Sequence, residues 1–233
     1  MASPAQRRLG RPPASNSTET RQRILDAARE IFAELGWDVT TNKDVATKAG
    51  ITSGALYHYF DSKLDIYLAV HLQAQITVDT RFSVAMETSD TFLGQLDAVL
   101  DAAHELNARD PSLARFVASA RVDLGRHADL RRKVGQRARA GEDSIARLVD
   151  TAVDTKAIDP SRRVELAAFL RTVLVGLTDA LSGDLSEHQT AIDAVRAVMR
   201  GNLLQSPRQT RKRTVEVTSS NGSSGRRGAR AAK

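Results

Sequence analysis

Apolar residues recur at helical spacing along most of the chain. Near its beginning one such stripe consists of Ile24, Leu25, Ala28, Ile31, Phe32 and Leu35. Residues three and four positions apart share a face of a helix, so this stripe predicts a helix that buries one side. Ser17 or Thr18 can cap its N-terminus, and Gly36 can adopt the left-handed conformation that ends a helix. We expect Trp37, the next residue, to pack in the core.

Start and stop signals divide the rest of the chain into eight further helices. Thr40 and Thr41 open a short helix that Gly50 ends, and Thr52 or Ser53 opens the next one. No pair of strands is predicted, so the expected fold class is all-α with about nine helices. The expected ranges lie close to 17–36, 41–49, 52–60, 61–86, 91–108, 111–125, 127–156, 161–183 and 187–204.

Composition agrees with this pattern and excludes several classes of protein. Aromatic residues make up 4% of the sequence, which suits helices better than strands because aromatic and β-branched residues favour strands. The sequence has no cysteine, which excludes disulfides and cysteine-based zinc sites. The first twenty residues contain no apolar signal segment, and no apolar run approaches the roughly 20 residues of a membrane span. We therefore expect a cytoplasmic protein that does not enter a membrane.

Positive charge is concentrated at the two ends of the chain. The formal net charge is +6, of which residues 1–17 contribute +3 and residues 205–233 contribute +7, leaving −4 for residues 18–204. Both ends lack a periodic apolar pattern, so we expect a disordered basic arm over 1–16 and a disordered basic tail over 205–233.

The arm contains Arg7, Arg8 and Arg11, and its segment Leu9-Gly10-Arg11-Pro12-Pro13 resembles the core of an AT-hook. An arginine in an extended arm can enter a narrow A·T minor groove. The alternative is a solvated basic tail.

The segment from Thr41 to Phe60 has the features of a helix-turn-helix. Ala46 and Gly50 provide a small residue at the helix crossing and a turn former, and Ile51 closes the junction. The outward face of the second helix carries small or hydrogen-bonding groups in place of a charged coat. Such a face is typical of a helix that reads the major groove, although a helical hairpin that only packs is the alternative.

Longer motifs in this region follow one another in register. They are Thr40-Thr41, Asp44-Val45-Ala46, Ala49-Gly50-Ile51, Gly54-Ala55-Leu56-Tyr57 and Tyr59-Phe60-Asp61-Ser62-Lys63. Together they resemble the DNA-binding domain of the TetR family of transcription repressors. Beyond Lys63 the chain resembles the family only in length and helical character. The resemblance implies a homodimer that binds a palindromic DNA operator and leaves it when a small-molecule effector enters a second, helical domain.

The resemblance also implies which residues contact DNA. Trp37 stands where the family usually has Phe or Tyr, and Ser53 stands where a longer basic residue is common. The implied contacts are Thr41, Lys43, Thr52, Ser53, Gly54, Ala55, Tyr57, His58, Tyr59 and Lys63, to which we add Arg7, Arg8 and Arg11 of the arm.

The expected domains are therefore the arm, a helix-turn-helix domain over 17–64, a regulatory and dimerisation domain over 65–204, and the tail. Apolar residues surround the predicted helix over 161–183, which indicates burial on more than one side and favours a dimer over a monomeric core. The expected interface residues are Phe169, Val173, Leu177, Leu181, Val195 and Met199. Polar residues within apolar stripes are candidates to line an effector pocket, or else are surface or satisfied core groups: His71, Gln75, His104, Asn107, Arg121 and Asp179.

No set of residues in the sequence matches the pattern of an active site. The five histidines show no paired-ligand spacing, and the chain has neither a glycine-rich phosphate loop nor a GxSxG motif. We therefore expect no enzyme activity, no cofactor and no metal. An architectural protein that holds DNA through its basic ends, with little sequence preference, is the competing function.

Overall fold

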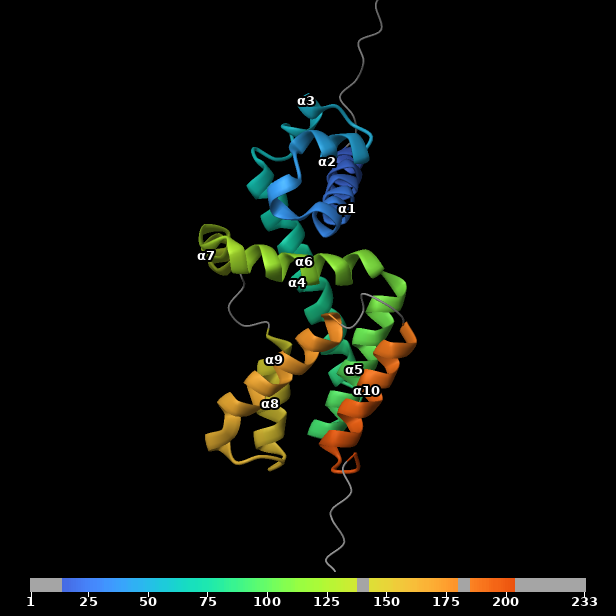
Figure 1. Cartoon of the computed structure of the whole chain (residues 1–233), viewed down its shortest axis with the longest axis vertical. Coiled ribbons are helices and arrows are strands. Elements are labelled where there is room, and N and C mark those ends of the chain that lie inside the picture. Colours follow the sequence, from blue (N-terminus) through green and yellow to red (C-terminus); the bar gives the residue numbers. More distant parts are fainter. Residues whose placement is uncertain (1–13, 138–142, 180–184, 204–233) are drawn as a thin grey trace, which may run out of the picture. The chain divides into compact units, whose positions relative to one another are not determined.

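The structure is a computed structural model that describes residues 14–137, 143–179 and 185–203. These residues form ten α-helices and one 3-10 turn, with no strand among them, which confirms the all-α class (Figure 1). The elements are α1 (Ala14–Val39), α2 (Asn42–Lys48), α3 (Ser53–Leu56), α4 (Lys63–Met86), α5 (Phe92–Arg109), α6 (Pro111–Arg126), α7 (Ala128–Arg137), α8 (Ser144–Asp154), η1 (Pro160–Arg162), α9 (Arg163–Asp179) and α10 (Leu185–Met199).

One predicted helix is wrong, because the range 127–156 contains two helices, α7 and α8. The carboxylate of Asp143 accepts hydrogen bonds from the N–H groups of Ile145 and Ala146 and so caps a new helix at this point. The apolar spacing within each piece is helical, and this is why the pattern did not reveal the break. Residues 138–142, between the two helices, lie outside the described residues.

The helices are held together by two clusters of buried apolar residues. The first joins α1, α2 and α3 to the beginning of α4 and to α6 and α7, and includes Phe32, Leu56, Tyr67 and Phe116. The second joins the end of α4 to α5, α8, α9 and α10. The core of the first cluster therefore crosses the expected boundary between residues 64 and 65.

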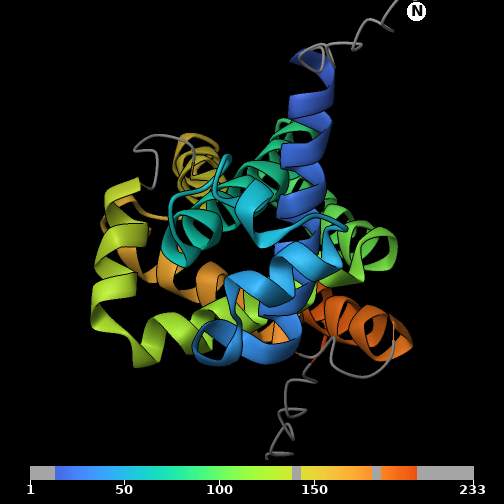
Figure 2. The ribbon, with the colours of Figure 1, turned by 90° about the horizontal axis from the view of Figure 1, so that it is seen from above.

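Helix α4 runs from the first cluster into the second, and α6 passes between the first three helices and the remainder (Figure 1). Figure 2 looks down onto α1, α2 and α3, with the other helices behind them. The predicted arm with Arg7, Arg8 and Arg11 and the predicted tail over 205–233 lie outside the described residues.

Candidate nucleic-acid interface and ligand cavity

Thr41 caps α2, as predicted. Its hydroxyl oxygen accepts a hydrogen bond from the N–H of Asp44 at 3.2 Å, and the Asp44 carboxylate accepts the Thr41 N–H at 2.9 Å, which completes a capping box. The Thr41 hydroxyl also donates to this carboxylate at 2.7 Å, and the hydrogen bonds from Thr41 lower the pKa of Asp44. A phosphate oxygen can only accept, so the Thr41 hydroxyl would have to leave Asp44 to donate to DNA.

The turn between α2 and α3 has the predicted chemistry. Gly50 has a φ of +68°, and a Cβ added there would meet nothing within 4 Å, so the backbone angle is the reason for glycine. The N–H of Ile51 donates to the carbonyl of Ala46 at 3.0 Å and closes the turn. Val45 and Leu56 are fully buried beneath it.

Helix α3 is a single turn that leaves much of its surface open. Thr52 caps it, accepting the N–H of Ala55 at 3.1 Å. The side chain of Tyr57 is 54% exposed, and its oxygen lies 3.2 Å from the Asn42 side-chain nitrogen, which donates to it from α2. Exposed positions from the predicted contact set are Thr41, Lys43, Thr52, Ser53, Gly54, Tyr57 and His58.

Two other predicted contact residues are partly buried. Tyr59 packs against the first apolar cluster, and Ala55 is only partly exposed. The ring of Tyr59 therefore helps to hold α3 in place, whereas the exposed residues present hydrogen-bonding groups outward. A contact from Tyr59 to DNA stays a prediction.

Lys63 is engaged within the protein. Its ammonium donates to the carbonyls of Trp37 at 2.7 Å and Thr40 at 2.9 Å and lies 4.4 Å from the centre of the Trp37 ring. Burial lowers the pKa of Lys63. Because an ammonium has three N–H groups, one remains for a phosphate oxygen, and the predicted DNA contact depends on that group.

The end of α1 is tied to α6 by a residue that the sequence analysis missed. Asp123, which is 6% exposed, accepts the backbone N–H of Trp37 at 3.0 Å and the Tyr67 hydroxyl at 3.4 Å. Burial raises the pKa of Asp123. Its place on the apolar stripe of α6, seven residues after Phe116, was the signal available in the sequence.

Known proteins share this arrangement. The family model described as bacterial regulatory proteins of the tetR family matches residues 24–70. The regulator SrpR of Pseudomonas putida is 36% identical over 96 residues, which cover 41% of this chain but only 45% of SrpR. The uncharacterized regulator TtgW of the same species is also 36% identical over 96 residues, which cover 41% of this chain and 72% of TtgW. The chain belongs to the TetR family.

A solved structure agrees with the fold of this TetR-family chain. The fatty acid degradation regulator FadR from Bacillus halodurans superposes with a TM-score of 0.64 at 18% identity, over 80% of this chain and 97% of FadR. At that identity the likeness concerns the fold alone. SrpR and TtgW are named as HTH-type transcriptional regulators, which agrees with the expectation that this chain is not an enzyme.

The described part of the chain contains neither a membrane-spanning helix nor a cluster of metal ligands. None of its helices is both long and apolar enough to cross a membrane. In the same residues, no three histidine, aspartate or glutamate side chains gather in a way that could hold a metal ion.

Two adjoining cavities lie beside α4 and α6 in this TetR-family chain, and α5, α8 and α9 also line the smaller one. The larger has about 490 Å³ and the smaller about 300 Å³. The two share Val78, Asp79, Val117, Arg121 and Asp143 in their walls, so they meet at these residues. Volumes of this size are usual for small-molecule sites.

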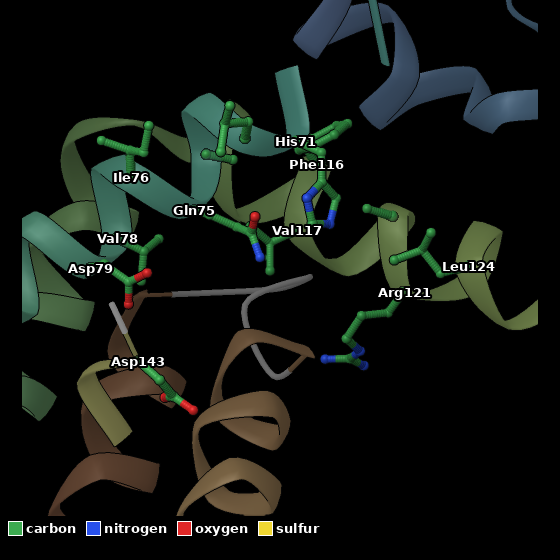
Figure 3. Close-up of a pocket in the computed structure, with 13 residues that line it drawn as sticks. His71, Gln75, Ile76, Val78, Asp79, Phe116, Val117, Arg121, Leu124 and Asp143 are labelled. Carbon is green, nitrogen blue, oxygen red and sulfur yellow. The ribbon is translucent and has the colours of Figure 1, made fainter. Parts of the chain in front are cut away.

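The cavities bring together most of the predicted pocket residues. His71, Gln75 and Arg121 line the larger cavity (Figure 3), and Asn107 and Arg121 line the smaller. His104 stands behind the wall of the smaller cavity, in contact with His188. The side chain of Asp179 lies outside the described residues.

His188 is a fully buried polar residue that the sequence analysis did not select. Its Nδ1 lies 3.0 Å from the Nδ1 of His104, and the Asn107 side-chain nitrogen donates to its Nε2 at 3.4 Å. With Nε2 accepting, Nδ1 of His188 carries the proton and donates to His104. Burial, with the charge of His104, lowers the pKa of His188, which keeps this ring neutral.

Charged groups at the meeting point of the cavities were also missed. Asp79 accepts a hydrogen bond from the Ser144 hydroxyl at 2.9 Å, and Asp143 pairs with Arg171 at 2.8 Å. Asp79 was only weakly indicated by the sequence, in which it follows Gln75 by four residues and so lies on the same face of α4. Asp143 and Arg171 reach the cavity from the start of α8 and from α9, and no local pattern shows that meeting.

Helix α9 leaves apolar side chains uncovered. Phe169 is 40% exposed, in keeping with its predicted place at an interface, and Val164 and Val175 are 80% and 39% exposed. A Cβ added to Gly176 would meet nothing within 4 Å.

One predicted interface residue is corrected. Leu177 is 5% exposed and lines the smaller cavity, because the opposite face of α9 packs into the chain's own core. Val173, Val195 and Met199 are partly buried against the second cluster, and Leu181 lies outside the described residues.

Proposed function

We propose that this protein is a homodimeric repressor that binds a palindromic operator through α2 and α3 and is released by a small molecule in the cavities. The observation that carries the proposal is the open surface of α3. Ser53, Gly54, Tyr57 and His58 are exposed there, next to Lys43 on α2. No described part of the chain covers these residues. Base edges are read by such groups in the major groove, while flanking basic residues contact phosphates.

The uncovered face of α9 supports the dimer. Val164, Phe169 and Val175 expose apolar surface, and Gly176 leaves room for the close approach of a second helix. A two-fold dimer places two reading heads on one face of DNA, with half-sites about 34 Å apart or a multiple of that spacing.

The cavities support regulation by a ligand. Helix α6 lines them with Val117 and Arg121 and, two residues later, holds α1 through Asp123. A shift of α6 on ligand binding moves the acceptor of the Trp37 N–H, at the end of the first helix of the reading head. The ligand therefore acts on the separation of the two heads in the dimer.

Selection of bound duplexes from random DNA tests the proposal. We expect an inverted repeat, and its symmetry reports the two-fold assembly. Duplexes that share no sequence would contradict specific reading and favour the architectural function.

Two variants that each remove one positive charge test whether α2 contacts the DNA. Lys43→Ala should weaken operator binding and lower the salt dependence of log K by about one, because one phosphate contact is lost. Lys133→Ala removes the same charge from an exposed position on α7 and serves as the control. Equal effects of both variants would contradict docking through α2 and α3.

A further inference from the structure

Among the described residues that line the cavities, Asp79 has a carboxylate without an ion-pair partner. Asp79 lies on α4, is partly buried and lines both cavities. The Ser144 hydroxyl donates to its Oδ1 at 2.9 Å. Within the described residues, no lysine, arginine or histidine forms an ion pair with this carboxylate. Figure 3 shows Asp79 extending from α4 toward the space that Gln75 and Arg121 also face.

The neighbouring charges already have partners. Arg171 pairs with Asp143 at 2.8 Å, and Arg121 donates to the carbonyl of Val175 at 3.3 Å and makes a further interaction. Arg147, the cation whose charge acts on Asp79, donates to the hydroxyl of Ser83. Among the described residues of the cavity wall, the negative charge of Asp79 is therefore the one left without an ion-pair partner.

The surroundings make this charge costly. Burial raises the pKa of Asp79, and the negative charge of Asp143 raises it further. A partly buried carboxylate gains most from a cation that reaches it out of water, because the attraction is stronger in a medium of low dielectric constant. A ligand in the cavity is the group placed to supply that cation.

Apolar side chains make up much of the wall, together with the paired groups Arg121, Asp143 and Arg171. Phe82, Leu106 and Leu174 line the smaller cavity, and Val78 and Val117 line both cavities. Such a wall binds a hydrocarbon body by removing it from water. The site thus combines a largely apolar chamber with a carboxylate, that of Asp79, which lines both cavities and has no ion-pair partner among the described residues.

We propose that the effector is an amphiphilic cation, whose ammonium group pairs with Asp79 while its hydrocarbon body fills the apolar chamber. This inference rests on the proposed role of the cavities as the effector site. An anionic ligand would place a second negative charge beside Asp79, and both arginines of the wall are already engaged, Arg171 with Asp143 and Arg121 with the Val175 carbonyl and a further group. Removing one partner from such a pair leaves an uncompensated charge, which is strongly unfavourable.

Three ten-carbon compounds test the charge requirement on the full-length protein: decylammonium, 1-decanol and decanoate. Binding is measured by isothermal titration calorimetry in the absence of DNA. We expect decylammonium to bind about tenfold or more tightly than 1-decanol, as a charge-assisted hydrogen bond provides. Decanoate should bind most weakly of the three.

Two variants that remove one negative charge locate the anchor. Asp79→Asn should bring the affinity for decylammonium down to that for 1-decanol and leave the affinity for 1-decanol nearly unchanged. Asp90→Asn, at an exposed position outside both cavities, should keep the full preference for the amine. Retention of the 1-decanol affinity in Asp79→Asn shows that the variant is folded.

Several results would overturn the inference. They are equal binding of the amine and the alcohol, tighter binding of decanoate, an amine preference that survives Asp79→Asn, or no binding of any of the three compounds. Because the readout contains no DNA, these results leave operator binding untouched. A chain that prefers the amine but selects no operator would instead refute the proposed function and keep the cation site.

Discussion

Lys63 and Lys43 are both predicted to contact phosphates, but their surroundings differ. Lys43 is exposed on α2, whereas the ammonium of Lys63 holds the carbonyls of Trp37 and Thr40 at the end of α1. The acidic residues differ in a similar manner: Asp79 is partly buried and Asp123 is buried, whereas many other acidic residues are exposed. Local surroundings therefore decide which charges contribute to stability and which are available to a ligand.

We expect Lys63→Ala to lower the free energy of unfolding by about 1–3 kcal/mol, because two carbonyls lose a charged donor and the ring of Trp37 loses its cation. Lys43→Ala should change it by less than about 0.5 kcal/mol, as is usual for an exposed site. Urea unfolding of both variants is the measurement. Equal losses would show that the contacts of Lys63 do not stabilise the domain.

Asp79→Asn should raise the free energy of unfolding at pH 7. Burial raises the pKa of Asp79 in the folded protein, so folding favours the protonated form, and its contribution to stability is lost as the pH rises through the folded-state pKa. Asparagine resembles the protonated carboxyl and does not titrate. The gain should therefore vanish below about pH 4, near the pKa of an unfolded aspartate.

Urea unfolding of Asp79→Asn from about pH 3.5 to about pH 8, a range that brackets the unfolded-state pKa, checks this, with Asp90→Asn as the charge-matched control. A variant that is less stable than the natural protein at pH 7 would show that the ionised carboxylate stabilises the fold. Such a result would assign Asp79 a structural role.

The junction between α1 and α6 depends on an unusual backbone conformation. Gly36 has a φ of +72° and a ψ of 179°, a region that is almost exclusive to glycine. A Cβ at this position would also lie 3.3 Å from Oδ1 of Asp123. This bend directs the N–H of Trp37 to Asp123 and lets the chain turn toward α2.

Gly36→Ala should cost about 1–3 kcal/mol or more of stability, from the backbone strain together with the crowding of Asp123. Gly135→Ala is the matched control, because that glycine is in α7 with nothing near its missing Cβ and alanine favours helix by about 1 kcal/mol. Thermal unfolding should shift in opposite directions for the two variants. A shift in the same direction would refute the constraint at Gly36.

Helix α9 exposes apolar side chains that a second copy of the chain could cover. Phe169 and Val175 are exposed, whereas Leu170 and Leu177 of the same helix are buried. A helix apolar on two sides is typical of one that packs against its own chain and against a second copy.

Phe169→Glu should convert the dimer to a monomer and reduce operator affinity with it, because the new charge would be buried in the interface. Val84→Glu adds the same charge at a 59% exposed position on α4 and should leave both properties unchanged. Sedimentation velocity gives the mass of each variant. A dimer that persists in Phe169→Glu would place the interface elsewhere.

Helices, caps and the turn of the reading head were predictable from the sequence, because each depends on residues within about four positions. Thr41 and Thr52 cap the helices expected of them, and Gly50 has the positive φ expected of the turn. The break between α7 and α8 was missed although Asp143 is a possible helix cap, because the apolar spacing is helical in both pieces and masked that local signal. The length of α3 was also overestimated, because its last residues form turns.

Contacts between distant segments required the folded structure. Lys63 meets carbonyls 23 and 26 residues earlier, and Asp123 meets an N–H 86 residues away. The sequence identified His71, Gln75, Asn107 and Arg121 as candidates to line a pocket, but not their division between two adjoining cavities, nor Asp79 in the wall of both. A repeating pattern records which side of each helix avoids water. The packing of those sides against one another decides which charges find partners, and therefore where an unpaired carboxylate is left for a ligand.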